Sequence, residues 1–455
     1  MLFNKIYFKT PKNMSNSKPN MPKGIPYIIG NEAAERFSFY GMKTILFVFM
    51  TQYILNSVGE KELMTPAEAN TWIHTFGASV YFFPILGALL ADILWGKYKT
   101  ILILSVLYCL GHIALAMDET RLGLSLGLTM VAIGSGGIKP CVSAHVGDQF
   151  TKKNQSLLSK VFSYFYISIN VGAAISSLLT PYLLREVGPW LAFGLPGFLM
   201  IVATFLFWFG RNSFVHVPPA GWKKYKENVF NKEGLGVIKK LAIIYLFISV
   251  FWALFDQTGS SIINQASNKL VNKSLGINGW QILPDQVQAV NPILVLILVP
   301  LFTFVIYPNL SKRFDLTPIK KIAIGMFIAV ISYLVIVFIQ LKIDGNQEVS
   351  IYWQFLAYFI LTISEVMVSV TALEFSYTQA PLVMKSFIMG LYLLSVSFGN
   401  FITAGFNALI QDENGVSKLS DVAYFSFFTL LMFVTAIVFS LVIVKSYKAK
   451  TYVHA

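Results

Sequence analysis

Charged residues are scarce in this chain. Only 13% of its 455 residues are Asp, Glu, Lys or Arg, and hydrophobic residues make up 55%, whereas a soluble globular protein carries roughly 25% charged residues. This shortage excludes an ordinary soluble protein and indicates a chain that crosses a membrane several times. Cysteine is also scarce: Cys109 and Cys141 lie in apolar stretches without metal-ligand spacing. We therefore predict neither a disulfide framework nor a metal site.

The first 25 residues lack a signal peptide with a cleavage site. They are polar and contain five lysines, which is typical of a disordered cytoplasmic tail, assigned to residues 1–26. Beyond the tail, apolar runs reach about 20 residues, the length that crosses a bilayer. Twelve membrane spans are predicted, near residues 27–56, 69–94, 98–117, 122–146, 157–184, 189–209, 239–264, 287–308, 318–342, 351–378, 386–410 and 422–445.

The placement of basic residues predicts the orientation of the chain. The predicted N-terminal tail, the connections from even to odd spans and the C-terminal tail together hold 25 Lys and Arg residues, and the opposite side holds seven. The positive-inside rule then places both termini in the cytoplasm. The net charge of +13 is thus mostly a topology signal, and no nucleic-acid partner is expected.

The longest polar connection divides the spans into two equal groups. Six spans in residues 27–209 precede it and six in residues 239–445 follow it, and a C-terminal tail is predicted from residue 446 to 455. The connection itself, residues 210–238, is basic and is expected in the cytoplasm. Two six-helix halves with such a linker resemble the major facilitator superfamily, so the expected fold is an all-α membrane protein of two six-helix bundles.

The first predicted span carries four charges, Glu32, Glu35, Arg36 and Lys43. Each charge in hydrocarbon costs roughly 2.5 kcal/mol or more, so these side chains must face protein or a water-filled cavity. At about 100° per residue, Glu32, Arg36, Tyr40 and Lys43 share one side of the helix and Glu35 lies at its edge. We interpret this stripe as the lining of the substrate cavity of a membrane transporter.

Three more spans contain isolated polar residues. His74 in the second span is either a proton acceptor, because imidazole titrates near pH 6.5, or a buried, hydrogen-bonded histidine. Lys139 in the fourth span needs a carboxylate from another helix or a cavity, and Glu365 in the tenth span matches it best in depth. Asn170 in the fifth span can either form hydrogen bonds with a peptide group or join two helices. The sequence pattern alone favours the contact between helices.

A pair between Lys43 and Asp256 of the seventh span is expected, because the two residues lie at similar depths. It would tie the halves together at the outer side, either as a permanent bridge or as a gate that breaks during the cycle. Asn291 precedes a proline at the start of the eighth span, which indicates a bend and an exposed amide. Ser369 lies on the same helical face as Glu365, four residues further on.

The charges of the two halves would together form a dipolar cavity. Such a cavity suits a zwitterion, with its carboxylate toward Arg36 and Lys139 and its ammonium group toward Glu365. Arginine offers a bidentate fork for a carboxylate, and buried titratable groups can carry protons. Nearby aromatic residues would supply pockets for variable side chains: Phe37, Phe39, Tyr40, Tyr166, Trp252 and Tyr392.

Residues 25–445 resemble the proton-dependent oligopeptide transporter family of the major facilitator superfamily. The resemblance is carried by five ordered motifs: ExxERFxFYG at 32–41, GGIKP with GDQF at 136–150, FYxxINxG at 165–172, FWAxFDQxGS at 251–260 and ExxxSxTxLEFSYxQAP at 365–381. It implies a secondary active transporter, not an enzyme, that imports di- and tripeptides with protons by alternating access. The proton gradient would drive the import without a cofactor.

The resemblance and the polar residues within the spans together suggest residue roles. Proton coupling is assigned to Glu32, Glu35, His74 and Asp256. Gating salt bridges are assigned to Lys43 with Asp256 and to Lys139 with Glu365. Substrate binding is assigned to Arg36, Tyr40, Lys139, Tyr166, Asn170, Trp252, Asn291, Glu365, Ser369 and Tyr392.

The chain departs from the family pattern in places. Phe39 stands where the family usually has Tyr, and Tyr392 where Trp is common, which leaves side-chain preference open. The linker after the sixth span is too short for an extra helix pair, and the connection near 343–350 is too short for the extracellular domain of animal members. The short form therefore predicts a bacterial inner membrane. We also expect the protein to be a monomer.

Two alternative functions are a transporter of a different substrate and a protein that is not a transporter. The same fold could carry nitrate, a free amino acid or another anion, as plant relatives do, although Glu365 favours a substrate with an amine. An intramembrane enzyme or a peptide-sensing receptor is disfavoured, because the sequence offers no nucleophile–base set, metal cluster or signalling domain. Peptide length, proton stoichiometry and the choice between His74 and the pair Glu32/Glu35 as main proton carrier stay open.

Overall fold

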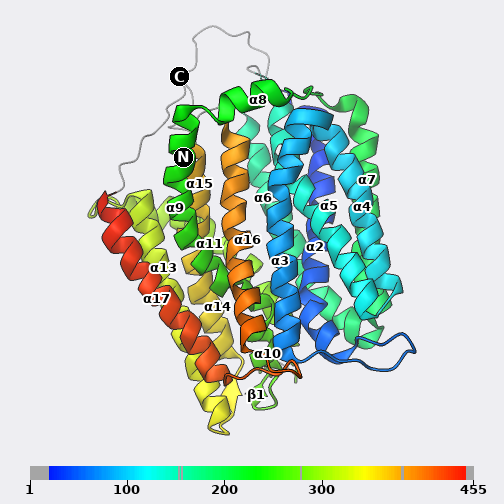
Figure 1. Ribbon diagram of the computed structural model, residues 1–455, viewed down its shortest axis with the longest axis vertical. Helices are drawn as coiled ribbons and strands as arrows, with labels where there is room; N and C mark the ends of the chain where they lie inside the picture. Colours follow the sequence, from blue (N-terminus) through cyan, green and yellow to red (C-terminus); the bar gives the residue numbers. More distant parts are fainter. Residues whose placement is uncertain (1–19, 152–153, 155–156, 277–278, 381–383, 447–455) are drawn as a thin grey trace.

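The computed structural model describes residues 20–151, 154, 157–276, 279–380 and 384–446, which are almost entirely helical (Figure 1). The predicted tails fall largely outside this part, in residues 1–19 and 447–455. The helices of the first half are α2 (Ile25–Gln52), α3 (Pro66–Leu89), the π-helical η1 (Leu90–Trp95), α4 (Lys97–Met117), α5 (Arg121–Asp148), α6 (Leu158–Glu186), α7 (Pro189–Phe209) and the 3₁₀ turn η3 (Gly210–Ser213).

The second half follows the short helix α8 (Trp222–Val229). Two short strands, β1 (Val271–Asn272) and β2 (Val349–Ser350), pair in parallel at the end of the molecule far from α8 (Figure 1). Its helices are α9 (Lys232–Phe255), the 3₁₀ turn η4 (Asp256–Gly259), α10 (Ser261–Ser267), the 3₁₀ turn η5 (Asp285–Ala289), α11 (Val290–Leu301), the π-helical η6 (Phe302–Ile306), α12 (Tyr307–Leu310), α13 (Pro318–Asp344), α14 (Tyr352–Glu365), the π-helical η7 (Val366–Val370), α15 (Thr371–Gln379), α16 (Lys385–Ile410) and α17 (Asp421–Ser446).

Each predicted span overlaps a helix or a series of helical segments; the first extends past the end of α2 at Gln52, and the turn residue Ser260 interrupts the seventh. Among the described residues, eleven of these are long and apolar enough to cross a membrane. Helix α2 is not among the eleven, although it has 28 residues, because its four charges lower its hydropathy. The all-helical membrane fold is confirmed, whereas the count of twelve spans and the cytoplasmic termini stay predictions.

Local sequence signals explain where several helices begin. The side chains of Thr65, Thr120, Asn231 and Thr317 cap α3, α5, α9 and α13, and each accepts a hydrogen bond from a backbone N–H three residues later. Such caps satisfy N–H groups that have no partner within the helix. These caps define where the helices begin, next to the apolar runs from which the membrane spans are predicted.

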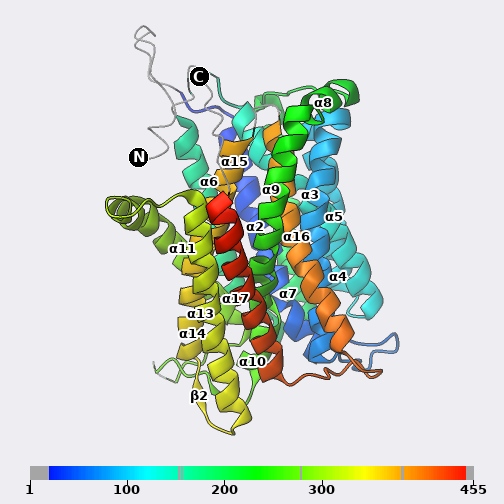
Figure 2. The same cartoon turned by 60° about the vertical axis from the view of Figure 1, so that its left-hand side comes forward.

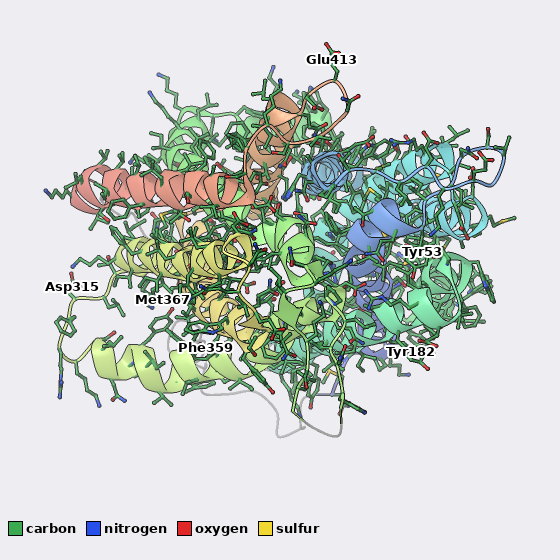
Figure 3. All side chains as sticks on the ribbon, turned by 90° about the horizontal axis from the view of Figure 1, so that it is seen from below. Tyr53, Tyr182, Asp315, Phe359, Met367 and Glu413 are labelled. Atoms are coloured by element: carbon green, nitrogen blue, oxygen red, sulfur yellow. The ribbon has the colours of Figure 1, made fainter. Side chains whose placement is uncertain are left out.

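The hydrophobic core has two main parts. One is built from residues 25–214 with Ile263 of α10, and the other from residues 225–443. Figure 3 shows the two halves of the chain side by side, with Tyr53 and Tyr182 on the first and Phe359 and Met367 on the second. Helix α8 lies across one end of the molecule (Figures 1 and 2).

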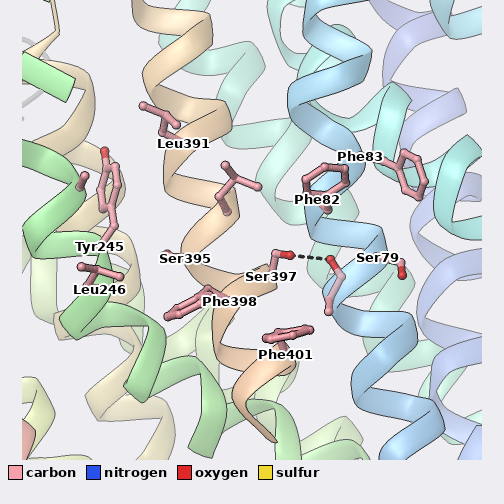
Figure 4. A pocket seen from close by; sticks show the side chains of 13 residues that line it. Ser79, Phe82, Phe83, Tyr245, Leu246, Leu391, Ser395, Ser397, Phe398 and Phe401 are labelled. Atoms are coloured by element: carbon pink, nitrogen blue, oxygen red, sulfur yellow. Dashed lines mark hydrogen bonds between the residues drawn. The ribbon is translucent and has the colours of Figure 1, made fainter. Parts of the chain in front are cut away.

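A crevice of about 590 Å³ lies between α3, α9 and α16 (Figure 4). Its lining is apolar apart from serine and tyrosine hydroxyls, and Phe82, Phe398 and Phe401 beside it are exposed. The Ser397 hydroxyl donates to the Ala78 carbonyl at 2.7 Å across its floor. Its lining residues include no charged side chain, and none of the charged residues described below takes part in it.

Small residues bring α3 and α5 into backbone contact, as glycine-rich helices do in membranes. A Cβ atom built on Gly87 would lie 2.1 Å from the carbonyl oxygen of Gly137, and one on Gly136 would lie 2.5 Å from the carbonyl oxygen of Val80. Both contacts are with backbone atoms, which cannot turn aside as a side chain can. The spacing of α5 from α3 therefore depends on these glycines.

We predict that Gly87→Ala destabilises the protein by about 1–3 kcal/mol, the usual penalty for overpacking. Gly405→Ala in α16 is the matched control, because nothing lies within 4 Å of a Cβ atom there. Thermal unfolding of the detergent-solubilised protein should show a lower midpoint for Gly87→Ala only. Equal midpoints for the two variants would contradict the close contact.

Candidate functional site

Three of the four charged residues of α2 pair with one another within the helix. The Arg36 Nε atom lies 2.6 Å from Glu32 Oε1 and 3.0 Å from Glu35 Oε2, and the Ser135 hydroxyl of α5 donates to Glu35 Oε1 at 3.2 Å. The side chain of Arg36 is 11% exposed and each glutamate side chain 2%. The four-residue spacing that the sequence places on one face thus becomes a compact, buried cluster of one cation and two carboxylates.

Lys139 of α5 is a buried cation for which the described part of the chain offers Nζ no hydrogen-bond partner. The ammonium group lies instead 3.8 Å from the ring centroid of Phe39 and 4.7 Å from that of Tyr81. Cation–π contacts stabilise such a group only partly. Lys139 is therefore the cation of the site that an incoming anion would benefit most.

Glu365 ends α14 in the other half and is held by an amide. Asn291 Nδ2 donates to Glu365 Oε2 at 2.7 Å and approaches Thr362 Oγ1 at 3.1 Å. The π-helical segment η7 begins at the next residue, a local geometry that is frequent at functional sites. No ion pair joins Glu365 to Lys139 among the described residues, so this gating pair stays a prediction for another conformation.

Polar groups on the surrounding helices differ in how well they are satisfied. The hydroxyl of Tyr166 and the indole nitrogen of Trp252 are buried, and neither has a hydrogen-bond partner within the residues described. Ser369 and Tyr392 contact each other, with 3.1 Å between their hydroxyl oxygens. Asn170 Nδ2 donates to the carbonyl of Tyr166, one turn earlier in the same helix. Buried donors without partners are rare, which marks Tyr166 and Trp252 as positions for a ligand or water.

The expected pair between the halves is present: Lys43 Nζ lies 3.0 Å from Asp256 Oδ1. The other oxygen of Asp256 accepts a 2.6 Å hydrogen bond from Asn400 Nδ2 of α16. His74 is fully buried, with Nδ1 2.8 Å from Asn400 Oδ1 and Nε2 2.9 Å from Ser260 Oγ. One polar network therefore connects α2, α3, η4 and α16.

Sequence reasoning did not find Asn400 or Ser260, although each carried a signal. Asn400 is an amide inside an apolar span, and Ser260 belongs to the motif that includes Asp256. It also did not find the second ion pair between the halves, in which Arg185 Nη2 of α6 lies 3.2 Å from Asp285 Oδ1 of η5. Asp285 is completely buried, yet it stands at the start of a span and reads as a loop residue.

More hydrogen bonds accompany these ion pairs at the same end of the molecule. The Gln286 amide donates to the carbonyl of Leu178 at 2.8 Å, and the Gln288 amide donates to the carbonyl of Thr44 at 3.1 Å. These contacts tie η5 of the second half to α6 and α2 of the first. The halves are thus held together on the side that the charge distribution predicts to be external.

The sequence was compared with protein families and curated proteins. The model of the POT family matches residues 98–232 and 223–422. Peptide transporter family 1 of Drosophila melanogaster is 37% identical over 369 residues, which cover 71% of this chain and 48% of that protein. Human solute carrier family 15 member 2 is 35% identical over 388 residues, covering 72% and 51%. The chain spans about half the length of the curated relatives it matches.

Solved structures resemble the chain over nearly its whole length. An auto-inhibited POT family peptide transporter superposes with a TM-score of 0.84 and 31% identity, covering 95% of this chain and 99% of that one. The POT family transporter PepTSo superposes with a TM-score of 0.83 and 35% identity, covering 93% and 98%. These proteins are named as transporters, not as enzymes. The chain is therefore an integral membrane protein that belongs to the POT family, the proton-dependent oligopeptide transporters.

Proposed function

We propose that this protein imports di- and tripeptides together with protons by alternating access. Membership of the POT family and the peptide-transporter names of its relatives support this proposal. The observation that carries it is that Lys139 and Glu365 are not paired with each other: within the described residues, the buried Nζ atom of Lys139 has no hydrogen-bonding partner, and Glu365 accepts a hydrogen bond from the neutral amide of Asn291. A short peptide carries the two opposite charges that would satisfy both.

Each end of the peptide has a candidate binding group. Its carboxylate would bind Lys139 and Arg36, because a cation in low dielectric interacts strongly with an anion, and its ammonium group would bind Glu365. The unsatisfied Tyr166 hydroxyl and Trp252 indole N–H would donate to its carbonyl groups. Further contacts are assigned to Tyr40, Asn170, Asn291, Ser369 and Tyr392.

Proton coupling would work through the charge balance around Arg36. While Glu32 and Glu35 are both ionised, two carboxylates compete with the peptide for one guanidinium group. Protonation of Glu35 would weaken its hold on Arg36, which would then be free to bind the peptide carboxylate. His74 and Asp256 would carry protons at the outer network. The proton gradient supplies the driving force, and no cofactor is required.

Gating would follow from the contacts between the halves. The pair of Lys43 with Asp256 would close the outer side and break when the transporter opens outward, and a pair of Lys139 with Glu365 would form at another stage of the transport cycle. Arg185 with Asp285 adds a second tie at the outer side. We propose that the protein works as a monomer in a bacterial inner membrane. Transport of nitrate or another anion would leave Glu365 without a cationic partner.

We predict that Glu35→Gln abolishes gradient-driven uptake of dialanine and spares counterflow, because glutamine keeps a polar group but cannot exchange a proton. The measurement is uptake into proteoliposomes with an inward-directed acid gradient, compared with exchange in its absence. His74→Gln, measured across the same pH series, is expected to lose less coupling. Equal losses would indicate a shared relay, and wild-type uptake that ignores the gradient would refute proton coupling.

We predict that Arg185→Ala shifts the protein toward an outward-open state, because it leaves the buried Asp285 carboxylate without its cation. Removing one partner of a buried ion pair costs about 3–5 kcal/mol. Distances between spin labels on the outer ends of α6 and α11 should lengthen. The matched control is Lys320→Ala, which breaks an exposed 2.8 Å pair with Asp315 within one half. An unchanged distance distribution in Arg185→Ala would contradict the gating role.

A further inference from the structure

The side-chain amide of Asn400 joins two of the groups assigned to proton coupling. Asn400 is 2% exposed, and its Nδ2 atom donates to Asp256 Oδ2 at 2.6 Å and to the carbonyl of Val396 at 3.1 Å. Its Oδ1 atom lies 2.8 Å from His74 Nδ1. The amide therefore stands between a carboxylate of the second half and an imidazole of the first.

The orientation of this amide follows from its neighbours. Nδ2 has two N–H groups, and it faces two acceptor oxygens: Oδ2 of the Asp256 carboxylate, which is paired with Lys43, and the carbonyl oxygen of Val396. A flipped amide would place Oδ1 against both of these acceptors, which is unfavourable. Oδ1 thus faces His74, and since a carbonyl oxygen can only accept, His74 Nδ1 must carry a hydrogen in every protonation state.

The remaining ring nitrogen of His74 is then the one that titrates. Nε2 lies 2.9 Å from the hydroxyl of Ser260, which can donate or accept by rotating its hydrogen. In the neutral ring Ser260 donates to the lone pair of Nε2. When a proton binds there, the N–H donates to Ser260, whose hydrogen turns away, and release reverses both changes.

The helix that carries His74 leaves room for the amide. A Cβ atom on Gly77 of α3 would lie 2.7 Å from Asn400 Oδ1 and 2.9 Å from its Cγ atom. These distances are shorter than real Cβ atoms tolerate, and the amide is held by hydrogen bonds on both sides. Glycine at this position therefore permits the close approach of α16 to α3.

We propose that Asn400 is a positioning residue that fixes His74 in the tautomer with hydrogen on Nδ1, links it to Asp256, and leaves Nε2 to exchange protons beside Ser260. The proposal deepens the proposed function, since it rests on His74 carrying a proton during transport. The charged groups that face this network are Asp256 from η4 and its partner Lys43 from α2. Through Asn400, a change in the protonation of His74 would affect the ion pair of Lys43 with Asp256, and a change in that ion pair would affect His74.

The tautomer of His74 can be measured directly. The full chain is labelled with ¹⁵N-histidine and placed in lipid nanodiscs. It is studied by solid-state NMR at a pH high enough for the imidazole ring to be neutral. The His74 signal is identified by its loss in His74→Gln. We expect hydrogen on Nδ1 in the wild type, and a mixture of tautomers or hydrogen on Nε2 in Asn400→Leu. Hydrogen on Nε2 in the wild type would overturn the proposal.

Gly77→Ala provides a second perturbation if Asn400→Leu does not fold, because the added methyl group displaces the amide without removing it. It should produce the same loss of the single tautomer. Asn407→Leu is the matched control: Asn407 is a buried amide two turns along α16 that donates to the carbonyl of Thr403 at 2.8 Å and to Tyr424 Oη at 3.0 Å. A changed His74 signal in this control would contradict a specific role for Asn400.

Transport provides the functional readout. Gradient-driven dialanine uptake should fall about tenfold in Asn400→Leu, since a hydrogen bond to a charged group contributes at least that factor, and counterflow should persist. Adding His74→Gln to Asn400→Leu should cause no further loss of gradient-driven uptake, because both substitutions act through the imidazole of His74. Additive losses would overturn the link. Gradient-independent uptake by the wild type would refute the proposed function alone, because the NMR result does not depend on transport.

Discussion

A charge within the hydrocarbon region must find a partner, and this constraint governs the structure. Helix α2 carries Glu32, Glu35, Arg36 and Lys43. In an isolated membrane helix, four charged side chains would cost a large amount of free energy. Three of them satisfy one another, and Lys43 reaches Asp256 in the other half. The first helix is thus stable in the membrane only when the second half is packed beside it.

The contacts between the halves differ in character from those within them. Within a half, glycines such as Gly87 bring backbones together and the contact is permanent. Between the halves, ion pairs and amide bridges are present at the outer side, where Arg185 meets Asp285 and Asn400 meets His74. Polar contacts of this kind can be exchanged for others at little net cost in free energy, whereas interlocked backbones cannot. Such a difference would allow each half to move as a rigid body, while the polar contacts between the halves break and form.

Much of this arrangement could be predicted from the sequence. Apolar run lengths locate the helices, helical periodicity places Glu32 and Arg36 on one face, and matching depths pair Lys43 with Asp256. The partner of Lys139 could not be predicted, because a search for opposite charge overlooks the aromatic faces of Phe39 and Tyr81.

Contacts that depend on helix rotation also escaped prediction. Asn400 and His74 are separated by 326 residues, and only the angle at which α16 faces α3 brings them together. Asp285 likewise reads as a loop residue until η5 packs against α6. Charge and depth were sufficient for Lys43 with Asp256, but they are insufficient for contacts that depend on how two helices are rotated against each other.

The central claim is that the ammonium group of Lys139, which has no hydrogen-bonding partner among the residues that the structure describes, binds the carboxylate of the peptide. It is tested most directly by the binding of dialanine and of dialanine amide, which lacks the carboxylate, to the wild type and to Lys139→Gln. The account predicts that the amide binds the wild type at least about tenfold more weakly, since a charge-assisted contact contributes that much, and that Lys139→Gln binds both ligands equally weakly. Equal binding of the two ligands to the wild type would contradict it.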